Sequence, residues 1–249
     1  MASEFSYLEG VFRALAGQSS PALIWYSAAG ERVELSGRVL ENWVSKSANF
    51  LVEECEFVAG EVLQLRMGLH WRSLLLAATA LRVGAVLDLA GQRAEAGLIF
   101  SDQLGILSAS TADYTVAVDR AVFSTGFTEK LGADMLDYCA LVSSYADQYT
   151  ALELPDSAGQ VFADQDLNYR DLPGLLEGAR DRGAGLPGSI VYPGFTDLEA
   201  ATLVNFLGLL AAGKGLLILD PSLQWSKPER EKIIAAERAA SWPVDGQRL

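Results

Sequence analysis

The sequence predicts an α/β protein with a doubly wound, mostly parallel sheet and helices on both faces. Short β-rich apolar runs alternate along the whole chain with helical stretches of ten or more residues, the spacing of strand–helix–strand units. Half of the 249 residues are hydrophobic and one fifth are charged, which is typical of a globular protein. The length suits a single domain over residues 1–249, or two packed lobes of about residues 1–150 and 151–249.

The first elements follow from periodicity and from the residues that stop them. Residues 5–16 form an amphipathic pattern that ends at Gly17, a residue that favours helix termini. Two β-rich runs, 22–26 and 32–35, flank Gly30 and predict a hairpin. Ser36 can cap a long helix that continues to about residue 54. The pattern then predicts a strand at 62–66, a helix at 71–83 and strands at 85–89, 97–101 and 114–118.

The second half repeats this alternation. The predicted helices are 134–146, 169–180, 197–210 and 228–240, and the predicted strands are 151–154, 161–163, 189–192 and 215–219. Ser226 and Glu229 have the spacing of a capping box at the start of the last helix.

Charge and composition exclude several classes of partner. The net charge of −13 should repel phosphate backbones and anionic lipid, so we expect no nucleic-acid and no membrane partner. The N-terminus lacks the apolar run of a signal peptide, and the apolar stretch 203–219 is interrupted by glycines and Lys214. Cys55 and Cys139 match no metal spacing and are expected to be buried thiols. We therefore expect a cytoplasmic protein.

Several short motifs in fixed order resemble those of the adenylate-forming superfamily, which contains acyl-CoA synthetases and other AMP-dependent ligases. In chain order they are Glu34-Leu35-Ser36 with Leu40, Ala48 and Leu51; Gly60-Glu61-Val62; Ala77, Ala80 and Gly84-Ala85-Val86-Leu87-Asp88; Pro193-Gly194-Phe195; the stretch 207–219; and Ile233, Glu237 and Arg238. Each motif is short, and it is their order and spacing together that carry the resemblance. The resemblance implies the fold of the first lobe of such an enzyme.

The phosphate-binding loop of that family departs most from its pattern here. The family has a loop of the form Thr-Ser-Gly-Thr-Thr-Gly-x-Pro-Lys-Gly, and this chain has residues 152–161, with one glycine, no threonine and no lysine. No Lys or Arg occurs between Leu131 and Tyr169, whereas that stretch holds several acids. Since such loops bind anionic oxygens through backbone N–H groups and a lysine, we expect no ATP cofactor.

Other parts of the family's machinery are also missing from the sequence. The aromatic–histidine pair of many acyl-CoA synthetases becomes Phe195-Thr196, and the chain reaches Leu249 without the family's adenine- and ribose-binding segments or its lid lysine. The resemblance therefore implies a truncated, degenerate relative with no catalytic residues, no bound cofactor and no metal.

Three further features are better explained by structure than by chemistry. His70, the single histidine, stands at the start of a predicted helix and is expected to cap or pack there. Gly213-Lys214-Gly215 follows a helix and precedes a strand, the reverse of a phosphate loop, and predicts a turn. Asp164 and Asp166 are expected to be solvated.

The leading hypothesis is a non-catalytic, enzyme-like module that binds a protein partner or a small acyl-like ligand. The alternative is half of a split acyl-CoA synthetase or AMP-dependent ligase that another chain completes. Any residual pocket at the carboxyl ends of the strands would be lined by Ser157, Gly159, Tyr192, Phe195 and Thr196. We also expect a homodimer, because apolar surface that later segments cover in the family would need another cover here.

Overall fold

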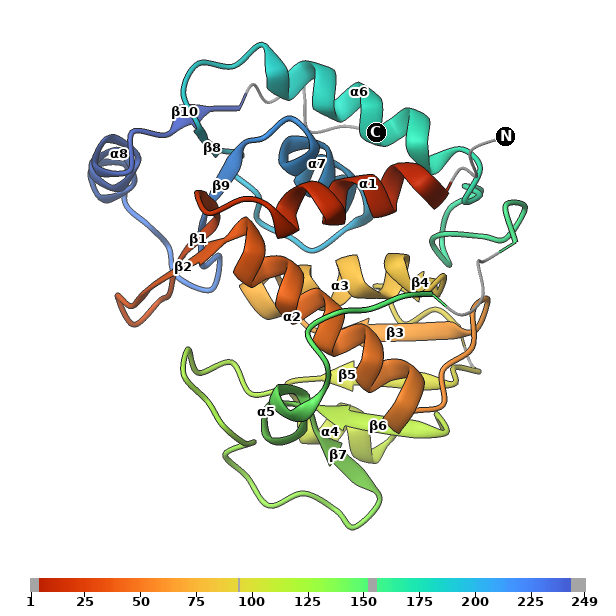
Figure 1. Ribbon diagram of the computed structural model, residues 1–249. Coiled ribbons are helices and arrows are strands. Elements are labelled where there is room, and N and C mark those ends of the chain that lie inside the picture. Colours follow the sequence, from red (N-terminus) through yellow and green to blue (C-terminus); the bar gives the residue numbers. More distant parts are fainter. Residues whose placement is uncertain (1–4, 94, 152–155, 243–249) are drawn as a thin grey trace. The chain divides into compact units, whose positions relative to one another are not determined.

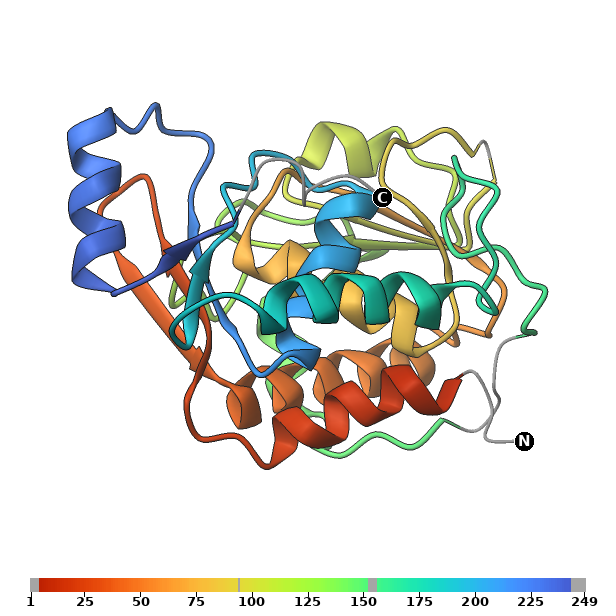
Figure 2. The same cartoon turned by 90° about the horizontal axis from the view of Figure 1, so that it is seen from above.

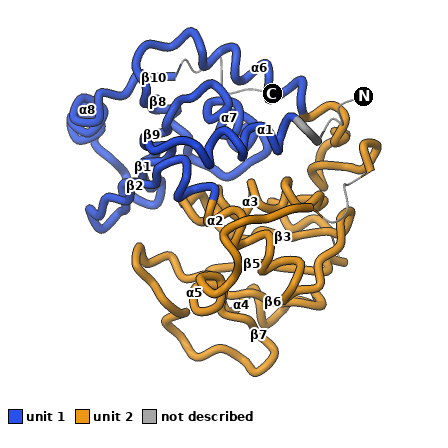
Figure 3. Tube along the Cα trace, in the orientation of Figure 1, with its two compact units in different colours: residues 1–41, 173–249 blue, residues 42–172 orange. Residues whose placement is uncertain are grey.

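The computed structural model describes residues 5–93, 95–151 and 156–242 and confirms the α/β class. The strands form two five-stranded sheets, so the prediction of one doubly wound sheet is refined to two mostly parallel ones. The chain divides into two compact units, residues 1–41 with 173–249 and residues 42–172 (Figure 3). Whether they behave as one domain or as two lobes stays a prediction.

The first unit has a sheet in the order β10-β8-β9-β1-β2. Its strands are β1 (Pro21–Tyr26), β2 (Arg32–Ser36), β8 (Ile190–Tyr192), β9 (Gly215–Leu219) and β10 (Ala240–Ser241). The β1–β2 pair is the antiparallel hairpin that the sequence predicts, and the other neighbours are parallel. Strand β9 is buried along its whole length, as its unbroken apolar run requires.

Helices cover both faces of this sheet. They are α1 (Phe5–Ala16), α6 (Leu172–Ala184), α7 (Ala200–Ala211) and α8 (Lys227–Ala236), with the first turn of α2 (Gly37–Asn49). Helix α8 packs Ile233 and Ile234 on a cluster that includes Ile24 and Leu217, and Figures 1 and 2 show α1, α6 and α7 on the other side of the sheet. Gly208 allows α6 to approach α7, because a Cβ there would lie 2.3 Å from the Cβ of Ala179.

The second unit has a fully parallel sheet in the order β4-β3-β5-β6-β7. Its strands are β3 (Val62–Arg66), β4 (Val86–Asp88), β5 (Leu98–Ser101), β6 (Tyr114–Ala117) and β7 (Met135–Asp137). Its helices are the rest of α2 with a π-helical turn (Phe50–Glu54), α3 (Trp71–Arg82), α4 (Leu104–Ser108), α5 (Tyr138–Leu141) and a 3₁₀ turn (Val142–Ser144).

Two apolar layers hold the second unit together. On one layer the ring of Phe50 packs edge-on against Tyr138 at 5.8 Å between centroids, and tilted against Phe100 at 6.3 Å. On the other, α4 buries Leu107 against Ile99 and Ala117. Helix α3, whose residues are all buried, connects β3 to β4. No helix within the described ranges is long and apolar enough to cross a membrane.

Several predicted elements are corrected by the structure. The helix expected at 134–146 is instead β7, α5 and the 3₁₀ turn, and the helix expected at 228–240 ends at Ala236, before β10. The helix expected at 36–54 changes from α to π at Phe50, where Cys55 donates its N–H to the Phe50 carbonyl oxygen at 3.3 Å. The run 161–163 makes a single bridge, between Phe162 and Leu87. The strand expected at 151–154 falls outside the described residues except for Ala151.

Candidate functional site

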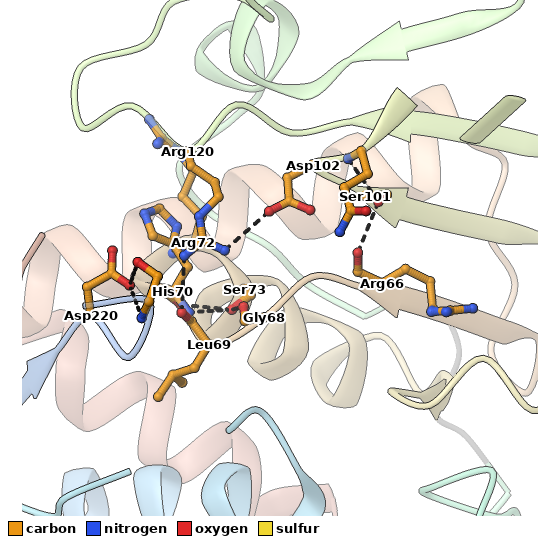
Figure 4. A network of polar contacts seen from close by, with 12 residues as sticks. Arg66, Gly68, Leu69, His70, Arg72, Ser73, Ser101, Asp102, Arg120 and Asp220 are labelled. Atoms are coloured by element: carbon orange, nitrogen blue, oxygen red, sulfur yellow. Dashed lines mark hydrogen bonds and ion pairs between the residues drawn. The ribbon is translucent and has the colours of Figure 1, made fainter. Parts of the chain in front are cut away.

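The carboxyl ends of the parallel strands in the second unit are the place where open α/β sheets bind ligands. Polar side chains do gather there, in the segments that follow β3, β5 and β6 (Figure 4).

His70 caps helix α3. Its ring Nδ1 accepts a hydrogen bond from the backbone N–H of Arg72 at 3.3 Å. The backbone N–H of His70 donates to Ser73 Oγ at 2.9 Å, which completes a capping box. The side chain is buried, and this burial, with the charges of Arg120 and Arg72, lowers its pKa to about 2. His70 is therefore neutral at physiological pH and has the capping role that the sequence predicts.

Arg72 and Asp119 fix the loop that follows β6. The Arg72 guanidinium lies 4.4 Å from the centroid of the Trp71 ring and donates to the carbonyl oxygens of Asp119, Ala121 and Val122 at 3.1, 2.6 and 3.3 Å. Burial alone would raise the pKa of Asp119, but hydrogen bonds from Thr128 and Ala121, with the charge of Arg72, hold it below its ordinary value. These groups act as loop anchors.

The remaining charged pair at this edge is also engaged. Arg120 Nη1 lies 3.2 Å from Asp102 Oδ2, and Arg120 Nη2 donates to the Leu69 carbonyl oxygen at 3.5 Å. Among the described residues, no group of three His, Cys, Asp or Glu side chains is arranged to hold a metal ion. The hydrogen bonds and ion pairs of these groups order the loops at this edge of the sheet.

The described part of the segment compared above with a phosphate loop, residues 156–161, forms hydrogen bonds within itself. Ala158 donates its N–H to Asp156 Oδ1 at 3.0 Å, and Gly159 donates to the Asp156 carbonyl oxygen at 2.8 Å. Val161 donates to the Leu167 carbonyl oxygen at 2.8 Å. Three N–H groups of this segment, those of Ala158, Gly159 and Val161, are therefore already bonded to acceptors of the chain, and one of these acceptors is a carboxylate. Residues 152–155 of this loop lie outside the described residues.

The five residues predicted to line a residual pocket occupy two segments. Ser157 and Gly159 share the turn just described, in the second unit. Tyr192, Phe195 and Thr196 lie in and after β8 in the first unit, where Phe195 is buried and Thr196 donates to Asp197 Oδ2 at 2.9 Å. Burial raises the pKa of Tyr192, although Arg230 opposes the shift. That these two segments form one pocket stays a prediction.

Other residues singled out in the sequence have structural roles. Gly213 has a φ of 72°, and Lys214 donates to the carbonyl oxygens of Leu186 and Gly188 at 2.7 Å each, which confirms a turn. Cys55 and Cys139 are free and buried, and burial raises the pKa of both thiols, that of Cys55 to about 12.

One polar arrangement was not predicted from the sequence. The buried carboxylate of Asp88, at the end of β4, accepts hydrogen bonds from four consecutive backbone N–H groups, those of residues 90–93. Gln64 Nε2 also donates to this carboxylate, at 3.3 Å, and to the Arg93 carbonyl oxygen at 2.7 Å. The sequence signal that could have revealed it is the small number of residues between the strands predicted at 85–89 and 97–101. So short a connection leaves no room for a crossover helix.

Comparison with known proteins identifies the fold. No family model matches the chain. A curated relative, the TIGR03089 family protein of Mycobacterium tuberculosis, is 25% identical over 225 residues, which cover 86% of this chain and 89% of that protein.

Solved structures of much lower identity have the same fold. An acyl-CoA synthetase of Brucella canis has a TM-score of 0.70 at 14% identity over 94% of this chain and 46% of its own. Acetoacetyl-CoA synthetase from Streptomyces lividans has a TM-score of 0.65 at 14% identity, and the match covers 86% of this chain and 38% of that protein. The N-terminal subdomain of NpsA from Klebsiella oxytoca has a TM-score of 0.60 at 14% identity, and the match covers 95% of this chain and 60% of that one. The chain spans about half the length of these structures and has the fold of the N-terminal lobe of adenylate-forming enzymes.

Proposed function

We propose that this chain is a non-catalytic module with an adenylate-forming fold, which binds a small acyl-like ligand or a partner protein. The observation that carries the proposal is the internally hydrogen-bonded loop at residues 156–161. Asp156 accepts two N–H groups of its own loop, and a carboxylate in this loop would repel a nucleotide phosphate.

The charges of the surrounding sequence also support a non-catalytic module. Adenylation depends on cations and oriented N–H groups that stabilise a negatively charged transition state. The stretch between Leu131 and Tyr169 offers no Lys or Arg. In the described part of this loop, the Arg93 side chain donates to Gln160 Oε1 at 2.7 Å, and it also donates to the Ala163 carbonyl oxygen.

The acyl-like ligand is suggested by the solved structures of similar fold, which include an acyl-CoA synthetase and an acetoacetyl-CoA synthetase. Phe195 retains the aromatic ring of the corresponding motif, and it is 8% exposed. An apolar ring beside a strand end suits an acyl or aryl group better than a phosphate.

The alternative is half of a split ligase. The observation that favours it is that the match to this chain covers 46% of the Brucella acyl-CoA synthetase. A split enzyme would still need a working phosphate loop in this chain. For that reason the non-catalytic module is the better proposal.

The test is binding and turnover with Mg-ATP. A ligand with a Kd of 0.1 mM, present at 10 mM, would stabilise the fold by about 2.7 kcal/mol. We expect no thermal shift with Mg-ATP between 0.1 and 10 mM, and no ATP–pyrophosphate exchange with a panel of fatty and aryl acids. The Asp156→Asn variant is the matched probe, because it removes the charge and keeps a side chain that can accept the Ala158 N–H.

A saturable shift with Mg-ATP in the wild-type chain, together with exchange, would refute the non-catalytic reading. Exchange that requires a second polypeptide would establish the split ligase. Native mass spectrometry of the purified protein tests the ligand directly, and we expect an adduct of low mass that is lost on denaturation.

A further inference from the structure

The connection between β4 and β5 is too short to contain a helix. The two strands flank β3 in the sheet, so residues 89–97 must cross over β3. Parallel crossovers need a dozen or more residues and usually contain a helix that covers the sheet. Here the structure shows no helix in this connection among the described residues, and Asp88 holds the turn in place through the N–H groups of residues 90–93.

A cavity of about 390 Å³ lies over this part of the sheet. Gln64 and Arg66 of β3 form its floor, since they are two residues apart on one strand and share a face. The crossover contributes Arg93, and the segment after α4 contributes Ser110 and Thr111.

The charge of this cavity is opposite to that of the chain. Among the described residues, its lining includes Arg66 and Arg93 and no Asp or Glu, although the chain has 32 acidic against 19 basic residues. The carboxylate of Asp88 lies nearby, but it does not line the cavity and is already saturated by backbone N–H groups and Gln64. An anion in the cavity would therefore meet the guanidinium of Arg66 and the donors that remain on Arg93, whose Nη2 bonds to Gln160 and Ala163, and no carboxylate of the described lining.

Arg66 is the group that is free to bind. Its guanidinium has no hydrogen bond or ion pair to any residue in the described part of the chain, and Figure 4 shows it extending away from the Asp102–Arg120 pair. Gly91 makes room for it, because a Cβ at Gly91 would lie 1.8 Å from Arg66 Nη1, and its φ of 70° also favours glycine. The crossover thus positions Arg66 without neutralising it.

Hydroxyl groups complete the set of donors. Ser110 Oγ accepts the N–H of Ala112 at 3.1 Å, which leaves its own proton to donate. Thr111 adds a second hydroxyl to the lining, and Ile106 and Ile99 supply an apolar wall. Two guanidinium groups with hydroxyl donors fit the three oxygens of a phosphate monoester, and the apolar wall fits a small organic group on its fourth oxygen.

We propose that this cavity binds a small phosphate monoester, with Arg66 as its principal ligand and Arg93 as the second cation. The site uses none of the residues of the predicted acyl pocket. Its ligand is also much smaller than a nucleoside triphosphate, since 390 Å³ is at the lower end of the volumes of ligand pockets.

The test uses methyl phosphate and inorganic phosphate as probes, titrated calorimetrically into the full chain at constant ionic strength. We expect one saturable site with a Kd below 1 mM for methyl phosphate. Arg66→Gln should weaken binding at least tenfold, and Thr111→Val two- to threefold. Arg13→Gln, at an exposed position on α1, is the matched control and should leave the Kd within twofold of wild type.

Circular dichroism establishes that each variant is folded, and Arg66→Lys, which keeps the charge but not the planar fork, should bind with intermediate affinity. The proposal is overturned if Arg66→Gln binds as tightly as wild type, or if no saturation occurs up to 20 mM. Acetate binding as tightly as methyl phosphate would overturn the assignment of a phosphate. Binding of methyl phosphate without any effect of Mg-ATP would leave the non-catalytic proposal intact, so the two proposals fail separately.

Discussion

Tyr26 and Glu237 are 211 residues apart in the sequence, and a hydrogen bond of 2.6 Å joins Tyr26 Oη to Glu237 Oε1. Arg32 on the neighbouring strand donates to the same carboxylate, from Nε at 2.7 Å and from Nη2 at 3.1 Å. Glu237 is the C-cap residue of α8, a helix with no fully buried residue. This carboxylate therefore fixes the end of a helix whose apolar contacts are few.

Replacing Glu237 should destabilise the fold in a pH-dependent way. The hydrogen bonds from Arg32 lower its pKa most, burial opposes them, and Tyr26 adds a further lowering. A lowered pKa means that the stabilisation is present above the ordinary value near 4.5 and is lost as the pH falls through the folded-state pKa. We expect Glu237→Gln to cost about 1–2 kcal/mol at pH 7.

Urea unfolding of both proteins at pH 7 and pH 3 checks this prediction, and the difference between them should shrink at the lower pH. Glu231→Gln is the control, because Glu231 is paired with Lys227 at 3.8 Å on the exposed side of the same helix, and such pairs contribute little. An equal loss for both variants would contradict the role of Glu237.

Arg72 should be among the most sensitive polar positions of the second unit. Its side chain is 6% exposed and supplies hydrogen bonds to three carbonyl oxygens of the loop after β6. Arg72→Met keeps the length of the stem and leaves these oxygens without that donor, so we expect a loss of about 2–3 kcal/mol in the free energy of unfolding. Arg13→Met should stay within about 0.5 kcal/mol of wild type in the same urea titration. A similar midpoint for the two variants would show that the loop is held by other contacts.

His70 gives the chain a second pH dependence. Its folded-state pKa of about 2 lies below the ordinary value of 6.5, so between these values the unfolded chain binds a proton that the folded chain does not. Stability should therefore fall as the pH drops below about 6.5, by up to about 1.4 kcal/mol per pH unit from this residue. In His70→Asn, which retains a capping side chain, this part of the slope should be absent.

The same property has a direct spectroscopic readout. His70 is the one histidine in the sequence, so its imidazole resonance can be assigned without ambiguity. We expect its chemical shift to stay constant between pH 5 and pH 8. A titration midpoint near 6.5 would show that the ring is accessible to solvent.

The sequence predicted best the elements whose local pattern and tertiary environment agree. The bounds of α1, β3 and β9 match the predicted ranges 5–16, 62–66 and 215–219. The helix predicted at 134–146 was wrong because its apolar residues suit either period. Pairing of Met135 with Thr115 in the sheet favours a strand, and Asp137 then caps a new helix by accepting the N–H of Ala140.

The pairing of strands that lie far apart in the sequence could not be predicted from the local hydrophobic pattern. Strand β1 pairs with β9, which lies almost at the other end of the chain, and no local signal specifies that partner. The roles of His70 and Lys214 were predictable, because capping and turn formation depend on neighbours in the sequence. The proposed role of Arg66 was not predictable, because it depends on a cavity whose other lining residues lie, apart from Gln64, well away from Arg66 in the sequence.

Self-association is the last expectation to test, and we propose that the chain forms a homodimer. The large apolar side chains that are exposed in the described residues are Val39, Val58, Phe123 and Leu223, and Phe123 stands out at 87% exposure. An aromatic ring in solvent is a common anchor of an interface, because its burial is worth about 2 kcal/mol or more per protomer. At physiological salt the repulsion between two chains of charge −13 is screened beyond about 8 Å, so it does not prevent contact. Light scattering at micromolar concentration should give about twice the chain mass of 26.7 kDa, and Phe123→Ser should shift the equilibrium toward the monomer. A mass near 27 kDa that does not change with concentration would rule the dimer out, and a dimer unaffected by Phe123→Ser would place its interface elsewhere.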